Sequence, residues 1–258
     1  MRIYAFHCGG DRASRAVCDP VDPAFAEVVY GPYFSFLITH PRGNVLFDTG
    51  LNPKWRGAND AGEGLAVEMR PNDGVVSKLA QLDLEPADIS HVVISHVLFD
   101  HAGGLRFFPH ARVIVQVSEL RFAHWPAVYQ RELYDRDDFD HELQWVEVDG
   151  DHDVFGDGAI VTTPTPGHTP GHQEAVVQLA SGVHVLVGDT HYLQTKMRER
   201  RLPGVLWSPD AMVPSWHKLE EIERTPGRQA DLHPRPRLRR DQAAGAGGLV
   251  RVTEGKLP

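Results

Sequence analysis

The sequence predicts an α+β protein in which two mixed β-sheets pack face to face and helices cover their outer surfaces. Short runs rich in β-branched residues recur from one end of the chain to the other, which predicts many strands. Helical stretches fall between some of these runs in both halves of the chain, so each sheet can be covered by helices. The 258 residues suffice for a substantial core, and we expect a single domain over residues 1–258.

The runs expected to form strands are rich in Val, Ile, Thr or aromatic residues and are bounded by Gly, Pro or Asp. They are residues 2–6, 33–38, 44–49, 91–95, 112–117, 143–148, 159–163, 174–179 and 183–188. The stretches that predict helices are residues 74–82, 118–125 and 208–223. The last of these has the clearest start, because Ser208 can cap the helix and Pro209 suits its first position.

Two long irregular segments, residues 51–73 and 125–140, interrupt this pattern. Functional loops are often long, so both could cover a substrate pocket, but surface linkers with some local structure are equally consistent with the sequence. From about residue 224 the chain becomes Arg-rich and then Ala/Gly-rich. This tail is typical of a solvated terminal segment, and a local disturbance of the reading frame is the alternative.

Composition excludes several classes of partner. The net charge of −9 gives no basic surface for nucleic acid or for an anionic membrane, so we expect a small-molecule substrate. No run approaches the roughly 20 apolar residues of a membrane span, and the first residues lack the apolar stretch of a signal peptide. With only two cysteines, Cys8 and Cys18, a cytoplasmic location is expected. The oligomeric state cannot be predicted.

The segment SHVLFDHAGG, residues 95–104, follows an apolar strand and places His96, Asp100 and His101 on the loop at its end. A rigid sheet presents functional side chains at such a position, which indicates a metal site. The two glycines that follow allow the backbone to bend sharply. A turn stabilised by the Asp and ended by Gly is the alternative interpretation.

Two further clusters also follow strands. In TPTPGHTPGH, residues 163–172, Pro and Gly turns fix the backbone around His168, and a rigidly held histidine is a good ligand. His172 could instead support a ligand. In VHVLVGDTHY, a strand ends before Asp189, and Tyr192 lies three residues further on. Packing of a half-buried tyrosine is the alternative for Tyr192.

Imidazole and carboxylate ligands without thiolates suit Zn, Mn, Fe or Co. A pair of such ions bridged by a carboxylate is a common hydrolytic device, because a bound ion lowers the pKa of water towards about 7. The chain contains neither a G-x-S-x-G elbow nor a Walker loop. The motifs therefore favour hydrolysis that uses metal ions rather than a serine nucleophile.

In combination, these motifs resemble the metallo-β-lactamase superfamily and, within it, the N-acyl-homoserine lactonase group. The residues that carry the resemblance are FLITHPRGNVLFDTG, SHVLFDHAGG, TPGHTPGHQ, and GDTHY followed by LPGVLWSPDAM, from about Tyr33 to near Glu223. The resemblance implies the αββα sandwich, two layers of sheet flanked by helices, that is named the metallo-β-lactamase fold. This agrees with the strand and helix pattern.

The resemblance also implies two divalent metal ions, with Zn as the expected metal, and assigns a role to each motif residue. His96 and His168 hold the first ion, Asp100 and His101 hold the second, and Asp189 bridges the two. The hydroxyl of Tyr192 meets the substrate carbonyl, and Asp100 returns a proton to the leaving alkoxide.

Three further positions bear on the metal site: Leu98, His233 and Asp48. The family pattern H-x-H-x-D-H departs at Leu98, which cannot bind a metal, so we expect the first site to be weakened. The remaining histidine of the second site corresponds to His233, where Pro234 stands in place of the usual Asp. Asp48, in the LFDTG turn, is expected to accept a hydrogen bond from a ligating histidine, although it could simply stabilise the turn.

The resulting hypothesis is a metal-dependent hydrolase that opens lactone rings, with N-acyl-homoserine lactones as the expected substrates. Water activated at the metal pair would attack the ring carbonyl, and the first ion and Tyr192 would stabilise the oxyanion. Two alternatives remain open: another ester or thioester hydrolase on the same scaffold, and a degenerate metal-binding protein without catalytic activity.

Overall fold

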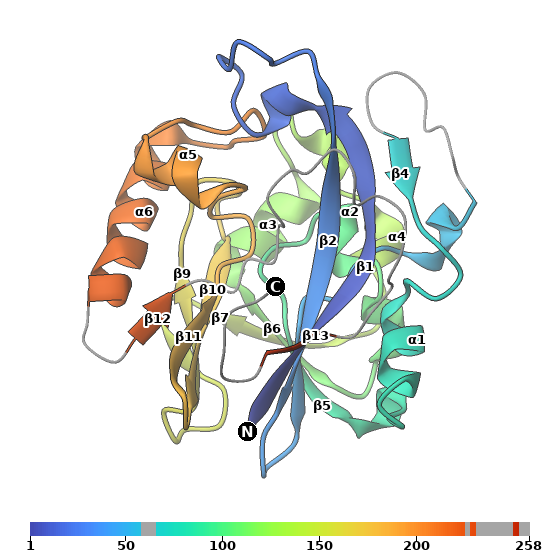
Figure 1. Cartoon of the computed structure of the whole chain (residues 1–258). Helices are drawn as coiled ribbons and strands as arrows, with labels where there is room; N and C mark the ends of the chain where they lie inside the picture. Colours follow the sequence, from blue (N-terminus) through green and yellow to red (C-terminus); the bar gives the residue numbers. More distant parts are fainter. Residues whose placement is uncertain (58–65, 225–227, 231–249, 253–258) are drawn as a thin grey trace.

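The computed structural model describes residues 1–57, 66–224, 228–230 and 250–252. Within these ranges the chain forms an eight-stranded sheet and a five-stranded sheet that face each other (Figure 1). The larger sheet has the order β13-β1-β2-β3-β5-β6-β7, with β4 beside β1, and the smaller has the order β12-β11-β10-β9-β8.

The larger sheet is mixed. Its strands β1, β2 and β3 pair antiparallel, whereas β3, β5, β6 and β7 pair parallel. Parallel neighbours require long connections, and these carry the helices on the outer face of the sheet. The strands are β1 (Arg2–Ser14), β2 (Val28–Thr39), β3 (Asn44–Phe47), β4 (Ala66–Glu68), β5 (Ile89–Val93), β6 (Arg112–Gln116), β7 (Gln144–Val148) and β13 (Val250–Val252).

The smaller sheet is antiparallel except for β12, which runs parallel to β11. In register, Ala175 of β10 lies opposite Leu186 of β11 and Thr162 of β9. The strands are β8 (His152–Asp153), β9 (Ile160–Pro164), β10 (Gln173–Leu179), β11 (Gly182–Leu186) and β12 (Arg228–Ala230).

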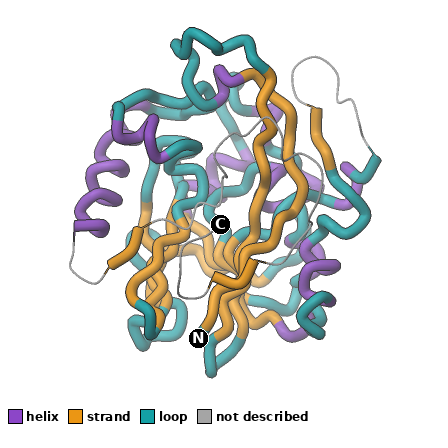
Figure 2. Tube along the Cα trace, viewed as in Figure 1, coloured by secondary structure: helices purple, strands orange, loops and turns teal. Residues whose placement is uncertain are grey.

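Helices cover the outer face of each sheet, and both figures show these layers (Figures 1 and 2). The larger sheet carries α1 (Val75–Ala80), α2 (Phe99–Ala102), α3 (Val117–His124) and α4 (Arg136–Phe139), and the smaller sheet carries α5 (Gln194–Arg198) and α6 (Pro209–Arg224). The core between the sheets joins side chains from both, including Phe36, Phe47 and Ile114 with Ala175 and Leu186. The predicted αββα sandwich is therefore confirmed.

A glutamine joins the two sheets next to the end of β5. The Gln173 amide nitrogen of the side chain donates to the carbonyl of Ile94 over 2.8 Å and to that of Ile114 over 3.2 Å. Its oxygen accepts from Gln116 over 3.0 Å, and the side chain is fully buried. This polar link fixes the start of β10 against the ends of β5 and β6.

The predicted strands and helices are present, with differences at their limits. The first strand continues to Ser14 because a bulge between His7 and Gly10 carries the pairing past the glycines. Helix α6 begins as predicted, since the Ser208 hydroxyl accepts from the backbone N–H of Ala211, but it also contains Pro214. The sequence did not predict seven elements of five residues or fewer: β4, β8, β12, β13, α2, α4 and α5.

The Arg-rich tail falls almost wholly outside the described residues, apart from β12 and β13. In the described ranges no helix is both long and apolar enough to cross a bilayer.

Candidate metal centre

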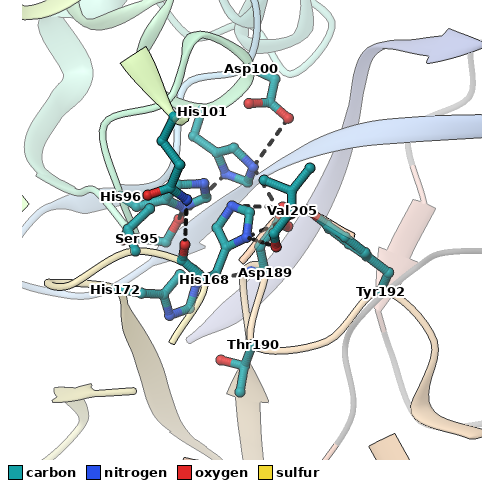
Figure 3. Close-up of polar contacts among 12 residues, drawn as sticks. Ser95, His96, Asp100, His101, His168, His172, Asp189, Thr190, Tyr192 and Val205 are labelled. Atoms are coloured by element: carbon teal, nitrogen blue, oxygen red, sulfur yellow. Dashed lines mark hydrogen bonds and ion pairs between the residues drawn. The ribbon is translucent and has the colours of Figure 1, made fainter. Parts of the chain in front are cut away.

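The predicted ligand side chains meet at one edge of the sandwich, where strands of both sheets end. His96 and His101 follow β5 of the larger sheet, His168 lies between β9 and β10, and Asp189 follows β11 of the smaller sheet (Figure 3). All four are buried, with at most 7% of the residue exposed. Segments remote in sequence thus contribute to one cluster.

Asp189 lies between two of the imidazoles. Its Oδ1 is 3.6 Å from His101 Nε2, and its Oδ2 is 3.6 Å from His168 Nε2. The ring of His96 is 4.0 Å from that of His101 and 4.7 Å from that of His168, measured between centroids. One carboxylate therefore presents one oxygen to each side of the cluster, which is the arrangement expected of a bridging ligand.

The donor atoms fit a metal ion. Ligand atoms of His96, His101 and Asp189 all lie within 4.8 Å of one another. Among the described residues, Nε2 of His96 and Nε2 of His168 are buried without a hydrogen-bond partner. A buried polar atom of this kind is costly unless something binds it. Nitrogen and carboxylate donors at this spacing match the preferences of Zn²⁺.

The opposite nitrogen of each imidazole has a partner that turns Nε2 into the cluster. Asp48 Oδ2 accepts from His101 Nδ1 over 2.8 Å, and the carbonyl of Val205 accepts from His168 Nδ1 over 3.2 Å. Ser95 Oγ donates to Asp48 Oδ2 over 2.8 Å and lies 2.9 Å from His96 Nδ1, from which it can accept. Such partners set the tautomer and the orientation of a ligating imidazole.

The charge distribution favours a cation beside His101. Burial lowers the pKa of His101, but the carboxylates of Asp100, Asp48 and Asp189 outweigh it and hold the pKa well above its usual range. For His96, burial and the neighbouring imidazoles hold the pKa well below the usual range. The cluster therefore combines neutral imidazole nitrogens with carboxylates beside His101 that attract positive charge.

The predicted contact of Asp48 with a ligand histidine is present. Asp48 has a φ of 60°, a left-handed conformation that few side chains other than Asn and Asp tolerate. Both of its carboxylate oxygens accept hydrogen bonds, since the backbone N–H of Ser95 also donates to Oδ1 over 2.7 Å. The LFDTG turn therefore aims this carboxylate at the loop that carries His96 and His101.

The side chains predicted to act on substrate lie at the margin of the cluster. Asp100 Oδ2 is 3.5 Å from His101 Nε2, and Tyr192 Oη is 3.5 Å from His168 Nδ1 (Figure 3). A small hollow next to His101 and Asp189 has a largely aromatic wall, formed by Tyr33, Phe34, Phe36 and Phe47.

The long segments contact this region. Leu51 and Met69, from the first segment, pack in one cluster with Phe99, which directly precedes Asp100. Gln130, from the second segment, donates through its side chain to the carbonyl of His168 over 2.9 Å. The segments therefore support the ligand loops on two sides.

Leu98 and His233 are the two remaining positions that the sequence singled out. Leu98 is only 3% exposed and belongs to the hydrophobic cluster that covers the larger sheet, together with Ala102 and Leu105. His233 lies outside the described residues.

Sequence reasoning missed several side chains that support the ligands. Gln130 and Glu119 bind backbone atoms of the loops that carry His168 and His96, and no motif identifies them. Ser95 begins the SHVLFDHAGG segment, but the segment gives no sign of its contact with His96. His172 acts through its ring: Nε2 accepts from the backbone N–H of Asp189 over 2.9 Å, and Thr165 lies 2.9 Å from Nδ1. Burial lowers the pKa of His172 to about 3, so the ring is neutral.

A four-layer sandwich with a cluster of imidazoles and a carboxylate at its edge is typical of one class of metal-binding proteins. Comparison with known proteins identifies the family. The metallo-beta-lactamase superfamily profile matches residues 29–237, and the chain belongs to this superfamily.

Individual proteins within this superfamily are also similar to this chain. A protein of Azorhizobium caulinodans named N-acyl homoserine lactonase AttM is 37% identical over 208 residues, which are 75% of this chain and 78% of that one. N-acyl homoserine lactonase AiiA of Bacillus thuringiensis subsp. kurstaki is 29% identical over 198 residues, 74% of this chain and 76% of that one. A solved structure of an N-acyl homoserine lactone hydrolase, with the product N-hexanoyl-L-homoserine at its catalytic metal centre, superposes with a TM-score of 0.80 at 23% identity. It covers 89% of this chain and 91% of that one, and at this identity the likeness concerns the fold.

Proposed function

We propose that this protein is a metal-dependent hydrolase that opens the lactone ring of N-acyl homoserine lactones. One observation carries the proposal: in the described part of the chain, Nε2 of His96 and Nε2 of His168 are buried without a hydrogen-bond partner in the cluster around Asp189. This chain is 37% identical to a protein named as such a lactonase. The relatives' names supply the substrate class, and the cluster supplies a means of acting on it.

The proposed assignment places one ion against His96 and His168 and a second against Asp100 and His101, with Asp189 between them. His233 is proposed as a further ligand of the second ion. When bound, two Zn²⁺ ions would supply Lewis acidity that polarises an ester carbonyl and makes water a nucleophile near neutral pH.

The remaining chemistry belongs to side chains of this chain. Tyr192 is placed beside His168 so that its hydroxyl can donate to the carbonyl oxygen of the lactone, where negative charge develops. Asp100 is proposed to pass a proton from the attacking water to the leaving alkoxide as the ring opens. The aromatic wall of the hollow beside His101 offers side chains against which an apolar part of the substrate could pack.

Leu98 reduces the number of ligands available to the first ion, so we propose an activity lower than a complete ligand set would give. A reducing compartment such as the cytoplasm is proposed because the chain has only two cysteines, too few for a disulfide framework.

Ring opening of N-hexanoyl homoserine lactone by the zinc-loaded protein tests this function, because hydrolysis releases acid that a pH-stat records. Asp189→Ala is the control, since it removes the residue that faces both imidazoles. We expect turnover by the parent and none above background by the variant, with bound zinc reduced in the variant. Turnover of a thioester but not of the lactone would show that the substrates are thioesters and not lactones. Bound zinc without turnover of either would indicate a non-catalytic metal-binding protein.

A further inference from the structure

A single buried carboxylate connects the two loops that carry His96 and His168. Glu119 lies in the first turn of α3 and is fully buried, outside the proposed ligand set. Its Oε1 accepts from the backbone N–H of Val97 over 3.0 Å. Its Oε2 accepts from the hydroxyl of Thr169 over 2.6 Å and from the backbone N–H of Gly171 over 3.1 Å.

These donors adjoin the proposed ligands. Val97 directly follows His96 in the loop after β5 of the larger sheet, and Thr169 directly follows His168 in the loop between β9 and β10 of the smaller sheet. Each carboxylate oxygen of Glu119 thus holds a different sheet's ligand loop. The separation of the two oxygens within one carboxylate is fixed, so the contact also fixes how the loops lie relative to each other.

The loop and α3 are in close contact at Gly171. A Cβ atom at this position would lie 2.1 Å from the backbone nitrogen of Glu119, far inside a normal contact. Gly171 therefore lets the loop that carries His168 approach the helix backbone, and the carboxylate then reaches its amide directly. The contact leaves little freedom for the loop to shift.

We infer that Glu119 is a positioning residue that sets the spacing between His96 and His168 before a metal ion binds. The inference rests on the proposed metal-dependent function. A ligand pair held in place loses less conformational entropy on binding, which raises affinity. Removal of a partner that orients a metal ligand typically lowers affinity about 10- to 100-fold.

The carboxylate is needed because its donors approach both oxygens. A fourth donor, the hydroxyl of Tyr134, also points to Oε1 over 3.2 Å. A glutamine offers one oxygen and one NH₂ group, so an N–H would face either the amide of Gly171 or that of Val97. Glu119→Gln therefore keeps the size of the side chain and releases one of the two loops.

The test compares Glu119→Gln with Tyr134→Phe, which removes a donor to the same carboxylate but leaves both loops attached. Zinc affinity is measured by competition with a chromophoric chelator, and ligand geometry by the visible absorption spectrum of the Co²⁺-loaded protein. We expect Glu119→Gln to weaken zinc binding about 10- to 100-fold and to change the Co²⁺ spectrum. Tyr134→Phe should match the parent in both. Parent-like affinity and spectrum in Glu119→Gln, or equal losses in the two variants, would overturn the inference.

Amide hydrogen exchange of the metal-free proteins separates this inference from the proposed function. Faster exchange at Val97 or Gly171 in Glu119→Gln supports the positioning role even if the parent binds no zinc, a result that would reject the metal-dependent function instead. Unchanged exchange at both amides overturns the inference. If Glu119→Gln does not fold, Thr169→Val removes one tether at constant volume, and the same expected and overturning results apply to it.

Discussion

His101 Nδ1 and Asp48 Oδ2 are 2.8 Å apart, and this hydrogen bond directs Nε2 of His101 towards Asp100 and Asp189. The carboxylate belongs to a turn after β3, whereas the imidazole belongs to a loop after β5, so two neighbouring parallel strands cooperate to orient one ring. The orientation of His101 is therefore a property of the sheet and not of its own loop.

Replacement of Asp48 by Asn should weaken metal binding about 10- to 100-fold while the fold is kept. Asn tolerates the left-handed backbone, but its NH₂ group must face a donor, either Ser95 or His101. Zinc affinity by chelator competition measures the effect. Asp83→Asn is the matched control, because Asp83 also has a left-handed backbone, with φ 58°, on an exposed turn. Equal affinities of Asp48→Asn and the parent would refute the orienting role.

Tyr192→Phe removes only a hydroxyl, so we expect zinc content and thermal stability to stay at parent levels while turnover falls. The loss should reach up to roughly 10²- to 10³-fold if the hydroxyl is a main donor to the oxyanion. Initial rates of lactone opening at saturating substrate give the answer. A variant as active as the parent would leave Tyr192 with a packing role alone.

Leu98→His should increase both the zinc bound per chain and the rate of lactone opening. The parent offers His96, His168 and Asp189 to the first ion, and an added imidazole can complete a stronger set. Metal analysis after dialysis and initial rates measure the two quantities. Leu98→Met is the control, since it keeps an apolar side chain of similar size in the hydrophobic cluster and should behave like the parent. A parent that already holds two ions and does not respond to the imidazole would contradict this account of Leu98.

Glu174 should make the protein less stable as pH rises. Burial raises the pKa of this carboxyl to about 8, and neither of its oxygens has a hydrogen-bond partner within the described part of the chain. Because the folded state holds the proton more tightly than the unfolded state, the contribution of Glu174 is most favourable below about pH 4.5 and is lost as pH rises to about 8. The shift corresponds to roughly 5 kcal/mol between the protonation states, as an upper bound.

Urea unfolding of the parent and of Glu174→Gln at several pH values tests this expectation. The free energy of unfolding of the variant, relative to the parent, should increase between about pH 5 and pH 8 and then level off. Asp151→Asn changes an exposed carboxylate 3.6 Å from Lys218, the cation whose charge also acts on Glu174, and should keep the pH dependence of the parent. A relative stability of Glu174→Gln that is constant over this range would show that Glu174 is not a buried neutral carboxyl.

The fold and the loops that carry the clustered imidazoles could be predicted because their signals are local. Apolar runs mark the strands, and His96, His101, His168 and Asp189 each lie within a few residues of a strand end. Elements of four residues, such as α2 and α4, are too short for a helical repeat to show in sequence. They form because the surrounding layers pack on them.

The supporting contacts could not be predicted because they depend on distant segments. Glu119 binds a backbone amide 22 residues earlier and another 52 residues later, and a backbone amide carries no sequence signal. In sequence Glu119 resembles any acidic residue in the first turn of a helix. Only the assembled sandwich shows which atoms its carboxylate reaches.

The positions of the proposed ligands on two different sheets also affect how fast the protein unfolds. His96 and His101 come from one sheet and His168 and Asp189 from the other, so the complete site exists only after the two sheets have docked. We expect contacts between the two sheets to form late in folding, and an ion that stabilises contacts of this kind changes the unfolding rate far more than the folding rate. Bound zinc should therefore act mainly on the lifetime of the native state: the chain would fold at nearly the same speed with or without the metal, but would unfold more slowly once loaded.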